Sequence, residues 1–419
     1  MTYLTGLQCP LCGKQYPIEV RPKGCTEHRD TPSNLVPTYD YEAIYKAFDR
    51  NALPQRAPNM WRYREFLPAR TEDIVTLGEG MTPLIPVPRL GKKIGVPNLY
   101  VKNETVNPTW SHKDRMASVA VSVAPRFGMN KITASSSGNA GSATAAYAAR
   151  AGMDCIIFTI ARFPEAMKTQ MGVYGSKLVA MPTMQDRWKM VELLVDKYGW
   201  FNTAGFSSPA IGSNPYAVDG YKTLGFELCE QLGWRAPDAV VVPTGADLFW
   251  GAWKGFVDFR DAGYISQTPR MIAAETFGPL KNALEKELDF PEPVEGGPTV
   301  AISVGVNYST YLMLKAIRDS GGDAEVAGGD EAIMEMQLEL AKLEGLYAEA
   351  SSVQSLAVVK RLREAGRIRE DETVVAVLTS SGLKHVEVTS ERLPAIPQPQ
   401  PELENLIQAL ESAYGYKLS

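Results

Sequence analysis

Three turns rich in glycine, serine and threonine each follow a short apolar run of this chain. They are Ser135–Gly141 (SSSGNAG), Pro243–Asp247 (PTGAD) and Thr379–Gly382 (TSSG). Glycine lets backbone N–H groups come close to an anion, and a helix that begins in such a turn adds a favourable dipole. One such turn by itself is most often only a connection between a strand and a helix. Three of them predict that the chain binds one shared anionic ligand.

A lysine lies where a cation is electrostatically unfavourable. Lys113 belongs to the segment Asn107–Arg115 (NPTWSHKDR) and stands at the expected start of a helix, although cations are favoured at helix C-termini. A lone lysine in such a place is most often a solvated surface residue. Beside three anion-binding turns, the better interpretation is a partly desolvated amine with a depressed pKa that forms a Schiff base with a carbonyl.

Short apolar runs bounded by turn residues predict the strands that position these turns. Longer amphipathic stretches between them predict helices, two of which end at the glycines Gly152 and Gly366. The expected strands are Asn98–Val101, Lys131–Ala134, Cys155–Thr159, Lys177–Ala180, Ala239–Val242, Met271–Ala274 and Thr373–Leu378. The expected helices are Asn139–Ala151, Met184–Tyr198, Tyr216–Gln231, Glu331–Glu344 and Ser352–Ala365.

The alternation of strand and helix predicts an α/β fold in which a parallel sheet is covered by helices on both faces. Ligands of such sheets bind at the carboxyl ends of the strands, and the three turns follow strands directly. Beyond this region, Leu393–Pro401 (LPAIPQPQP) predicts a semi-rigid linker before a last amphipathic helix over Glu402–Ala413.

Composition and charge exclude several classes of protein. The chain has 419 residues, of which 45% are hydrophobic and 22% charged, as in a soluble globular protein of about two to three domains. Its net charge of −5 favours neither nucleic acid nor an anionic membrane as a partner, and its longest uncharged stretches contain prolines and polar residues that exclude a transmembrane helix. The N-terminus lacks a secretory signal, and five cysteines are too few for a disulfide scaffold. The cytoplasm is therefore the expected location.

Three of the five cysteines lie in the first 25 residues. Cys9 and Cys12 (CPLCGK) are followed by Cys25 and His28 (CTEH), which is a C-x2-C…C-x2-H pattern. Three thiolates and one imidazole form a known type of structural zinc site, and a site closed by four protein ligands is not catalytic. The alternative is a degenerate ribbon that has lost its metal. The charge balance does not favour a nucleic-acid role for this segment.

The lysine segment carries a family resemblance. Asn107–Arg115 resembles the lysine motif of the threonine synthase branch of the fold-type-II pyridoxal-phosphate enzymes. Five further segments match motifs of that family in the right order, so the resemblance covers about residues 5–390. They are Gly78–Leu84 (GEGMTPL), Ser136–Asn139 (SSGN), Asn214–Thr223 (NPYAVDGYKT), Glu349–Ser352 (EASS) and Thr379–Lys384 (TSSGLK).

The resemblance implies two open α/β/α domains with parallel sheets, preceded by a small zinc-ribbon-like segment. The implied division of the chain is 1–40 for the ribbon, 41–105 plus 215–395 for a large cofactor-binding domain, 106–214 for a small domain with the asparagine loop, and 396–419 for the linker and last helix. By analogy with the family, the protein is expected to be a homodimer.

The resemblance also implies a role for each site residue. Lys113 would hold pyridoxal 5′-phosphate as a Schiff base and act as the base, Asn139 would bind the 3′-oxygen of the cofactor, and Thr379 would meet its pyridine nitrogen. The expected ligands of the substrate α-carboxylate are the main-chain amides of Ser136, Ser137, Asn139 and Ala140. The expected phosphate turn is Gly245, Ala246, Asp247, Leu248 and Phe249, in which an acidic side chain is tolerable only if it points away.

Two residues of the lysine segment depart from the resembled family. His112 replaces a phenylalanine, and either transfers a proton or packs beside the cofactor as a neutral ring. Trp110 replaces a glycine, and either adds bulk near the site or fills a gap in the domain interface.

The expected substrate follows from a further departure. In the resembled family, a hydroxyl, an asparagine–serine pair and an arginine bind the phosphate of phosphohomoserine, whereas this chain has Ala140, Ile211-Gly212 and Ala217 there. Losing one charged partner of a desolvated anion costs about 2–5 kcal/mol. The sequence therefore predicts β-elimination of water from threonine, serine or an arylserine such as phenylserine, giving a 2-oxo acid and ammonia. The alternative is a threonine synthase whose phosphate clamp is rebuilt, for instance from Lys222 or Arg115, and a third interpretation is a non-catalytic binder.

Overall fold

A computed structural model describes residues 2–28, 31, 33–207, 209–245 and 247–418. The chain forms two compact units, residues 1–384 and residues 385–419. The second unit contains the short helix α14 (Glu387–Ser390) and helix α15 (Leu403–Tyr414), separated by the proline-rich segment 391–402. The expected linker and last helix are thus present. Among the described residues, no helix combines the length and the apolar character that a membrane crossing requires.

A six-stranded sheet forms the largest layer of the first unit, in the strand order β12-β11-β10-β13-β5-β4. All neighbouring strands are parallel except β4, which runs antiparallel to β5. The strands are β4 (Leu84–Pro86), β5 (Leu99–Asn103), β10 (Ala239–Pro243), β11 (Arg270–Glu275), β12 (Asp323–Val326) and β13 (Val374–Leu378).

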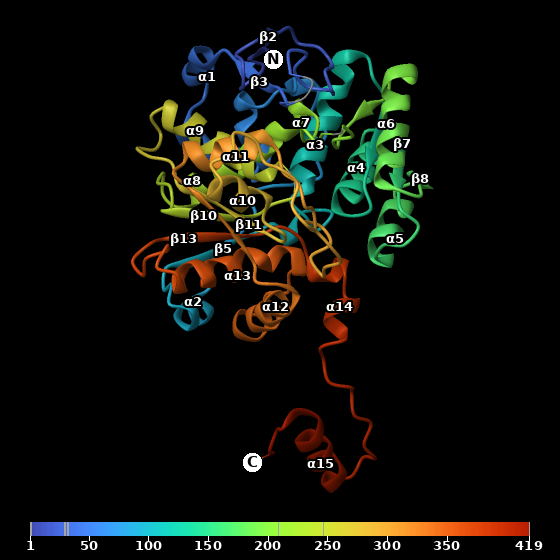
Figure 1. Ribbon diagram of the computed structural model, residues 1–419, viewed down its shortest axis with the longest axis vertical. Coiled ribbons are helices and arrows are strands. Elements are labelled where there is room, and N and C mark those ends of the chain that lie inside the picture. Colours follow the sequence, from blue (N-terminus) through green and yellow to red (C-terminus); the bar gives the residue numbers. More distant parts are fainter. Residues whose placement is uncertain (1, 29–30, 32, 208, 246, 419) are drawn as a thin grey trace. The chain divides into compact units, whose positions relative to one another are not determined.

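Helices cover this sheet on both faces (Figure 1). Right-handed crossovers place the helices between β10 and β12 on one face and those between β12 and β13 on the other. The central strands β10 (AVVVP) and β13 (VVAVL) are buried at every position, as a sheet covered twice requires. The helices are α2 (Pro88–Ile94), α8 (Lys222–Gln231), α9 (Leu248–Asp261), α10 (Pro279–Glu285), α11 (Tyr311–Asp319), α12 (Asp330–Glu344) and α13 (Ala350–Glu364).

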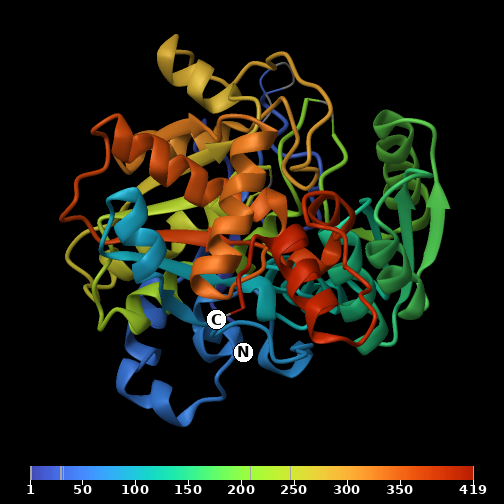
Figure 2. The same cartoon turned by 90° about the horizontal axis from the view of Figure 1, so that it is seen from below.

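A second, fully parallel sheet of four strands lies beside the first, in the order β8-β7-β6-β9 (green in Figures 1 and 2). The chain reverses its direction across this sheet after β8, so right-handed crossovers put α4 and α5 on one face and α6 on the other. Its elements are β6 (Lys131–Ser135), β7 (Asp154–Thr159), β8 (Lys177–Ala180), β9 (Phe201–Asn202), α4 (Asn139–Arg150), α5 (Glu165–Val173) and α6 (Met184–Tyr198).

The N-terminal segment forms a small antiparallel sheet, β2-β1-β3, from β1 (Leu4–Gln8), β2 (Gln15–Tyr16) and β3 (Val36–Tyr39). Helix α1 (Tyr41–Ala47) and three 3-10 helices, residues 50–55, 60–66 and 71–73, then lead to the large sheet. Helices α3 (Lys113–Val123) and α7 (Pro215–Val218) pack against each other where the two parallel sheets approach.

Every strand expected from the sequence is present to within two residues at each end, and the α/β fold with two open sheets is confirmed. The expected helix Tyr216–Gln231 is interrupted, because α7 and α8 are joined by a 3-10 turn at Asp219–Tyr221. At this turn Gly220 lies so close to α3 that a Cβ on it would be 2.2 Å from the Arg115 carbonyl oxygen. The break therefore lets the chain pass α3 at close range.

Candidate active site

Lys113 is the first residue of α3, a helix in which every residue is buried. Burial lowers the pKa of its amine to about 8, because a charged ammonium loses hydration. The Nζ atom lies 5.6 Å from the centre of the Tyr221 ring, and no described carboxylate is close enough to form an ion pair with it. The amine is thus desolvated, and although the Asp247 charge acts on it, it forms no ion pair with a described carboxylate, which leaves it available to a ligand.

The turn after β13 holds the residues around Lys113 in place. The His112 backbone N–H donates to the Thr379 carbonyl oxygen at 2.9 Å, and Ser111 forms an antiparallel bridge with Ser380. Strands β5, β13 and β10 are adjacent and parallel, so the segments that follow them, with Lys113, Thr379 and Gly245, lie at the same edge of the sheet.

Asn139 joins the small sheet to this edge. It begins α4, and its amide Nδ2 donates to the Glu349 carboxylate at 2.9 Å and to Ser303 Oγ at 3.3 Å. Its Oδ1 accepts a hydrogen bond from Ser380 Oγ at 3.2 Å. The turns at 135–141 and 379–382 therefore meet, as the shared-ligand hypothesis requires.

Thr379 places a neutral hydroxyl at the carboxyl edge of the six-stranded sheet. Its Oγ1 lies 2.9 Å from Ser352 Oγ, and the Ser352 hydroxyl in turn accepts from the Ser380 backbone N–H at 2.9 Å. Thr379 is buried, and the first turn of α13 thus fixes its position.

His112 packs as a neutral ring. It is buried, and its pKa lies well below the ordinary value because of desolvation and the nearby Lys113 ammonium. Its Nδ1 lies 3.1 Å from the Thr379 carbonyl oxygen, which can only accept a hydrogen bond, so Nδ1 carries the proton of the neutral ring. The centre of the His112 ring lies 5.6 Å from that of the Tyr221 ring. Of the two hypotheses for His112, this geometry favours packing.

Trp110 does not fill a gap in an interface. Its side chain is 45% exposed, and its backbone has a φ of 66°, a left-handed conformation that favours the glycine of the resembled family. The Trp110 carbonyl oxygen accepts from the Ser381 backbone N–H at 3.0 Å. The residue thus keeps the turn geometry at a cost in backbone strain.

One of the four expected α-carboxylate ligands is already engaged. The Ser136 backbone N–H donates to the Phe158 carbonyl oxygen at 2.9 Å, so the prediction for that amide is wrong. Its hydroxyl accepts from the Gly138 and Gly141 amides at 3.2 and 2.9 Å and so shapes the loop. The amides of Ser137, Asn139 and Ala140 donate to no described residue, and they remain candidates.

The expected phosphate turn precedes α9. A Cβ on Gly245 would lie 2.8 Å from Val304 Cα, so only glycine fits there. The Asp247 carboxylate turns toward the neighbouring loop and accepts from the Ser213 backbone N–H at 2.9 Å. Leu248 and Phe249 are buried, whereas Ala246 lies outside the described residues. The turn is thus compatible with an anion, and its binding of phosphate stays a prediction.

The two residues expected to rebuild a phosphate clamp cannot do so. The Arg115 guanidinium is fully buried and pairs with Glu104 at 2.7 Å and Glu227 at 2.5 Å. Lys222 pairs with Asp219 at 3.0 Å and Asp258 at 3.3 Å. That suggestion from the sequence is wrong, because both cations already have anionic partners.

Two of the apolar replacements, Ile211 and Ala217, do not form a lining for a substrate side chain either. Ala217 is fully buried within α7, and the Ile211 side chain is directed toward Gly24 of the N-terminal segment. A cation that sequence reasoning missed lies nearby instead. Arg187 of α6 donates through Nη1 to Ser137 Oγ at 2.7 Å. Arg187 and Ser137 are 50 positions apart in the sequence, so no local sequence pattern reveals this contact.

A desolvated lysine at the edge of one open parallel sheet, facing an asparagine loop from a second, defines a fold-type-II pyridoxal-phosphate enzyme. The chain belongs to the pyridoxal-phosphate dependent enzyme family, whose model matches residues 75–380. Within that class it falls in the threonine synthase-like branch. It is 36% identical over 390 residues to the threonine synthase of Methanocaldococcus jannaschii, covering 90% of this chain and 92% of the relative. It is 35% identical to that of Methanosarcina acetivorans, with the same coverages.

Solved structures agree on the fold. Threonine deaminase isoform 2 from Solanum lycopersicum matches with a TM-score of 0.62 and 18% identity, covering 82% of this chain and 88% of that one. A fungal L-serine ammonia-lyase from Rhizomucor miehei matches with a TM-score of 0.62 and 20% identity, covering 74% and 96%. The residues of the site fit the cofactor of this family, because a buried amine without an acidic partner faces hydrogen-bonding side chains and unpaired loop amides.

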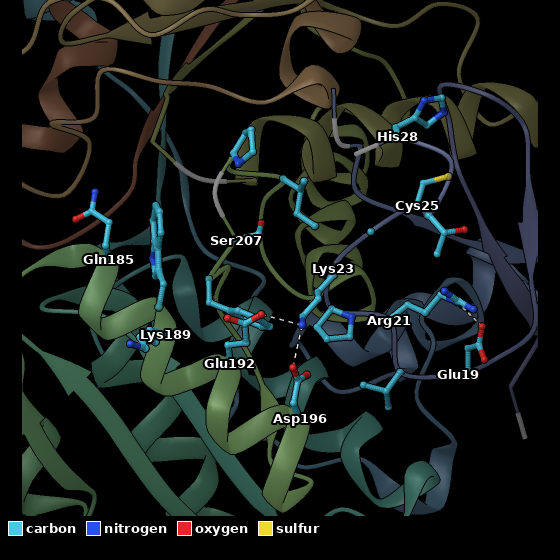
Figure 3. A pocket seen from close by; sticks show the side chains of 18 residues that line it. Glu19, Arg21, Lys23, Cys25, His28, Gln185, Lys189, Glu192, Asp196 and Ser207 are labelled. Atoms are coloured by element: carbon cyan, nitrogen blue, oxygen red, sulfur yellow. Dashed lines mark hydrogen bonds and ion pairs between the residues drawn. The ribbon is translucent and has the colours of Figure 1, made fainter. Parts of the chain in front are cut away.

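The four expected metal ligands also lie together. One ligand atom from each of Cys9, Cys12, Cys25 and His28 falls within 4.8 Å of the others, and the cysteines form no disulfide. Cys25 and His28 border a hollow of about 870 Å³ between the N-terminal segment and α6 (Figure 3). Lys23 spans this hollow and pairs with Glu192 and Asp196 at 2.8 and 2.9 Å.

Proposed function

We propose that the protein converts O-phosphohomoserine and water to threonine and inorganic phosphate, which is a threonine synthase reaction, as the names of its relatives suggest. The observation that carries the proposal is the 36% identity to a threonine synthase over 90% of the chain. The match to the family model, residues 75–380, includes Lys113, Asn139 and Thr379. Dehydration of a β-hydroxy amino acid, which the sequence favoured, loses its main argument, because Ile211 and Ala217 do not line the site.

Lys113 is the proposed base. Bound cofactor supplies an electron sink that stabilises negative charge at the substrate Cα. With its pKa at about 8, about one-tenth of the Lys113 amine is unprotonated at pH 7, against far less than about 1% for an ordinary lysine. The amine can therefore take the Cα proton and deliver a proton to Cγ, the carbon that loses phosphate. Tyr221 excludes water from one side of the amine.

Two other groups orient the reactants. The unpaired amides of Ser137, Asn139 and Ala140 at the start of α4 are proposed to bind the α-carboxylate, an anion favoured at a helix N-terminus. The neutral Thr379 hydroxyl, held by Ser352, is proposed to meet the pyridine nitrogen. A hydroxyl does not favour protonation of that nitrogen as a carboxylate would, and this moderates the electron sink and favours elimination over transamination.

The second candidate is β-elimination of water from threonine, serine or phenylserine. Ala140 favours it, because this loop residue offers a methyl group where the resembled family has a hydroxyl. Steady-state assays of the holoenzyme separate the two. We expect threonine and phosphate from O-phosphohomoserine, with a kcat/KM above that of every β-hydroxy amino acid. If a β-hydroxy amino acid has the higher value and gives a 2-oxo acid and ammonia, the second candidate is right.

We also propose that Cys9, Cys12, Cys25 and His28 hold a structural zinc ion. Zn–S bonds of about 2.3 Å in a tetrahedron put two sulfurs about 3.8 Å apart, and the Cys12 and Cys25 sulfurs lie 3.8 Å apart. The His28 Nε2 atom is buried without a hydrogen-bond partner among the described residues, as a ligand nitrogen would be. We expect one zinc per chain by elemental analysis, and less than one-tenth of that in Cys12→Ser. A metal-free wild-type protein would identify a degenerate ribbon.

A further inference from the structure

Arg187 is a cation without an anionic partner. It lies on α6, and its only hydrogen bond to a described residue runs from Nη1 to the neutral hydroxyl of Ser137 at 2.7 Å. Its Nε atom is buried and has no partner, and no described carboxylate lies within ion-pairing distance of the guanidinium. The side chain as a whole is half-buried. Withdrawing part of a charged group from water without a counter-charge is unfavourable, so it points to a ligand that supplies the charge.

The environment of Arg187 places it at the proposed active site. Ser137, its partner, belongs to the same turn as Asn139, whose amide contacts the Glu349 carboxylate. Burial raises the pKa of the Tyr308 phenol above its ordinary value. The Arg187 charge lowers that pKa and the Asp247 carboxylate raises it, so both charged groups act on the phenol. The charge of the Asp247 carboxylate also raises the pKa of the Lys113 amine, against the larger effect of burial. Arg187 therefore contacts the turn 135–141, which meets the turn 379–382 beside the Lys113 segment.

The free edge of the guanidinium has the right shape for an oxyanion. Its Nη1 is taken by Ser137, which leaves Nε and Nη2, the two donors along one edge of the planar group. Two parallel N–H donors match two oxygens of a phosphate or carboxylate. Because the unpaired amides at the start of α4 suit the α-carboxylate, the anion left for Arg187 is the one at the other end of the substrate.

We propose that Arg187 binds the terminal phosphate of the substrate through Nε and Nη2, with Tyr308 beside it as a further donor, and so determines substrate specificity. This inference rests on the proposed function, and it identifies the cation that the expected clamp residues, Arg115 and Lys222, do not provide. Ser137 is a positioning residue, because it holds the guanidinium through Nη1.

Helix α6 offers a matched control. Lys189 lies two residues further along and borders the hollow on the ribbon side, where it is exposed (Figure 3). Replacing Lys189 or Arg187 by methionine therefore removes one positive charge from the same helix, but only Arg187→Met removes the charge that contacts Ser137.

The experiment compares holoenzymes of the wild type, Arg187→Met, Arg187→Lys, Ser137→Ala and Lys189→Met. We expect Arg187→Met to lower kcat/KM for O-phosphohomoserine and the affinity for inorganic phosphate, measured by calorimetry, by roughly 30- to 4,000-fold. Arg187→Lys should regain only part of this, since an ammonium lacks the planar fork. Ser137→Ala should cost about fivefold and Lys189→Met less than about twofold. Exchange of the Cα proton of L-alanine with D2O, which needs no phosphate site, should be unchanged in Lys189→Met and retained in Arg187→Met.

Three results would overturn the inference. One is an Arg187→Met enzyme that uses O-phosphohomoserine as well as the wild type. Another is a Ser137→Ala loss equal to that of Arg187→Met, which would make Arg187 only a support for the loop. A third is loss of alanine exchange in Arg187→Met. If the wild type does not use O-phosphohomoserine, the proposed function fails, and the affinity for inorganic phosphate then tests the anion site by itself. Equal phosphate affinities of the wild type and Arg187→Met would overturn the anion site, whereas a lower affinity of Arg187→Met would support it.

Discussion

Two groups of cations in this protein differ in their partners. Arg115 pairs with both Glu104 and Glu227, and Lys102 pairs with Glu227, in a fully buried network. Lys113 and Arg187, next to the turns 379–382 and 135–141, form no ion pair with a carboxylate among the described residues. Only two positions separate Arg115 from Lys113 along α3, so sequence proximity does not decide which group a cation joins.

The difference indicates what each group is for. In a buried ion pair whose hydrogen bonds are satisfied, the two charges neutralise each other, and no donor or acceptor is free to bind a ligand. A desolvated cation without a counter-ion raises the energy of the free protein and is relieved when an anion or a carbonyl compound binds. We therefore assign the network to the architecture and the unpaired cations to the chemistry.

The largest effect is expected from Lys113→Ala. Because the amine is the proposed base, turnover should fall below detection, while circular dichroism and thermal unfolding stay like those of the wild type. Removing an unpaired buried ammonium breaks no ion pair, so the fold has no reason to weaken. Retention of one-tenth of the wild-type activity would refute the assignment.

Substitution within the network should instead destabilise the fold. Arg115→Met leaves Glu104 buried without its guanidinium partner and is expected to cost about 3–5 kcal/mol of unfolding free energy. Arg187→Met removes no ion pair and should cost less than about 1 kcal/mol. Urea denaturation of the two variants measures the difference. Equal losses would erase the distinction between the two groups.

The smallest effect is a pH dependence of the apoprotein. The Lys113 pKa is about 8 in the folded state and 10.5 in the unfolded state, so between these values the unfolded chain binds more protons. Stability should therefore rise with pH in this window, by up to about 3 kcal/mol from this residue. Lys113→Met should lack that contribution. A constant difference in unfolding free energy between the two proteins from pH 7 to pH 10 would contradict the lowered pKa.

The sequence predicted most of the fold because the signals are local. Apolar runs such as Ala239–Val242 and Val374–Leu378 read as buried strands without reference to the rest of the chain. The strand β12 (Asp323–Val326) was missed, because its DAEV sequence is half acidic. Its carboxylates are matched across space by cations such as Lys281 and Arg367, which no local pattern reveals.

The same limit applies to the site. Lys113, Asn139 and Thr379 were predicted because each lies in a motif that follows a strand or begins a helix. The engagement of the Ser136 amide depends on the Phe158 carbonyl of the neighbouring strand. The role inferred for Arg187 likewise depends on a contact with Ser137 and on the absence of an acidic partner among the described residues. Such properties belong to the packed structure.

The most direct test of the distinction between paired and unpaired cations is to reduce the holoenzyme with borohydride and locate the attached cofactor by peptide mass spectrometry. Lys102 and Lys222 are as deeply buried as Lys113, but both are held in ion pairs. We predict one pyridoxyl group per chain, on Lys113. A label on Lys102, Lys222 or any other lysine, with Lys113 unmodified, would contradict the account.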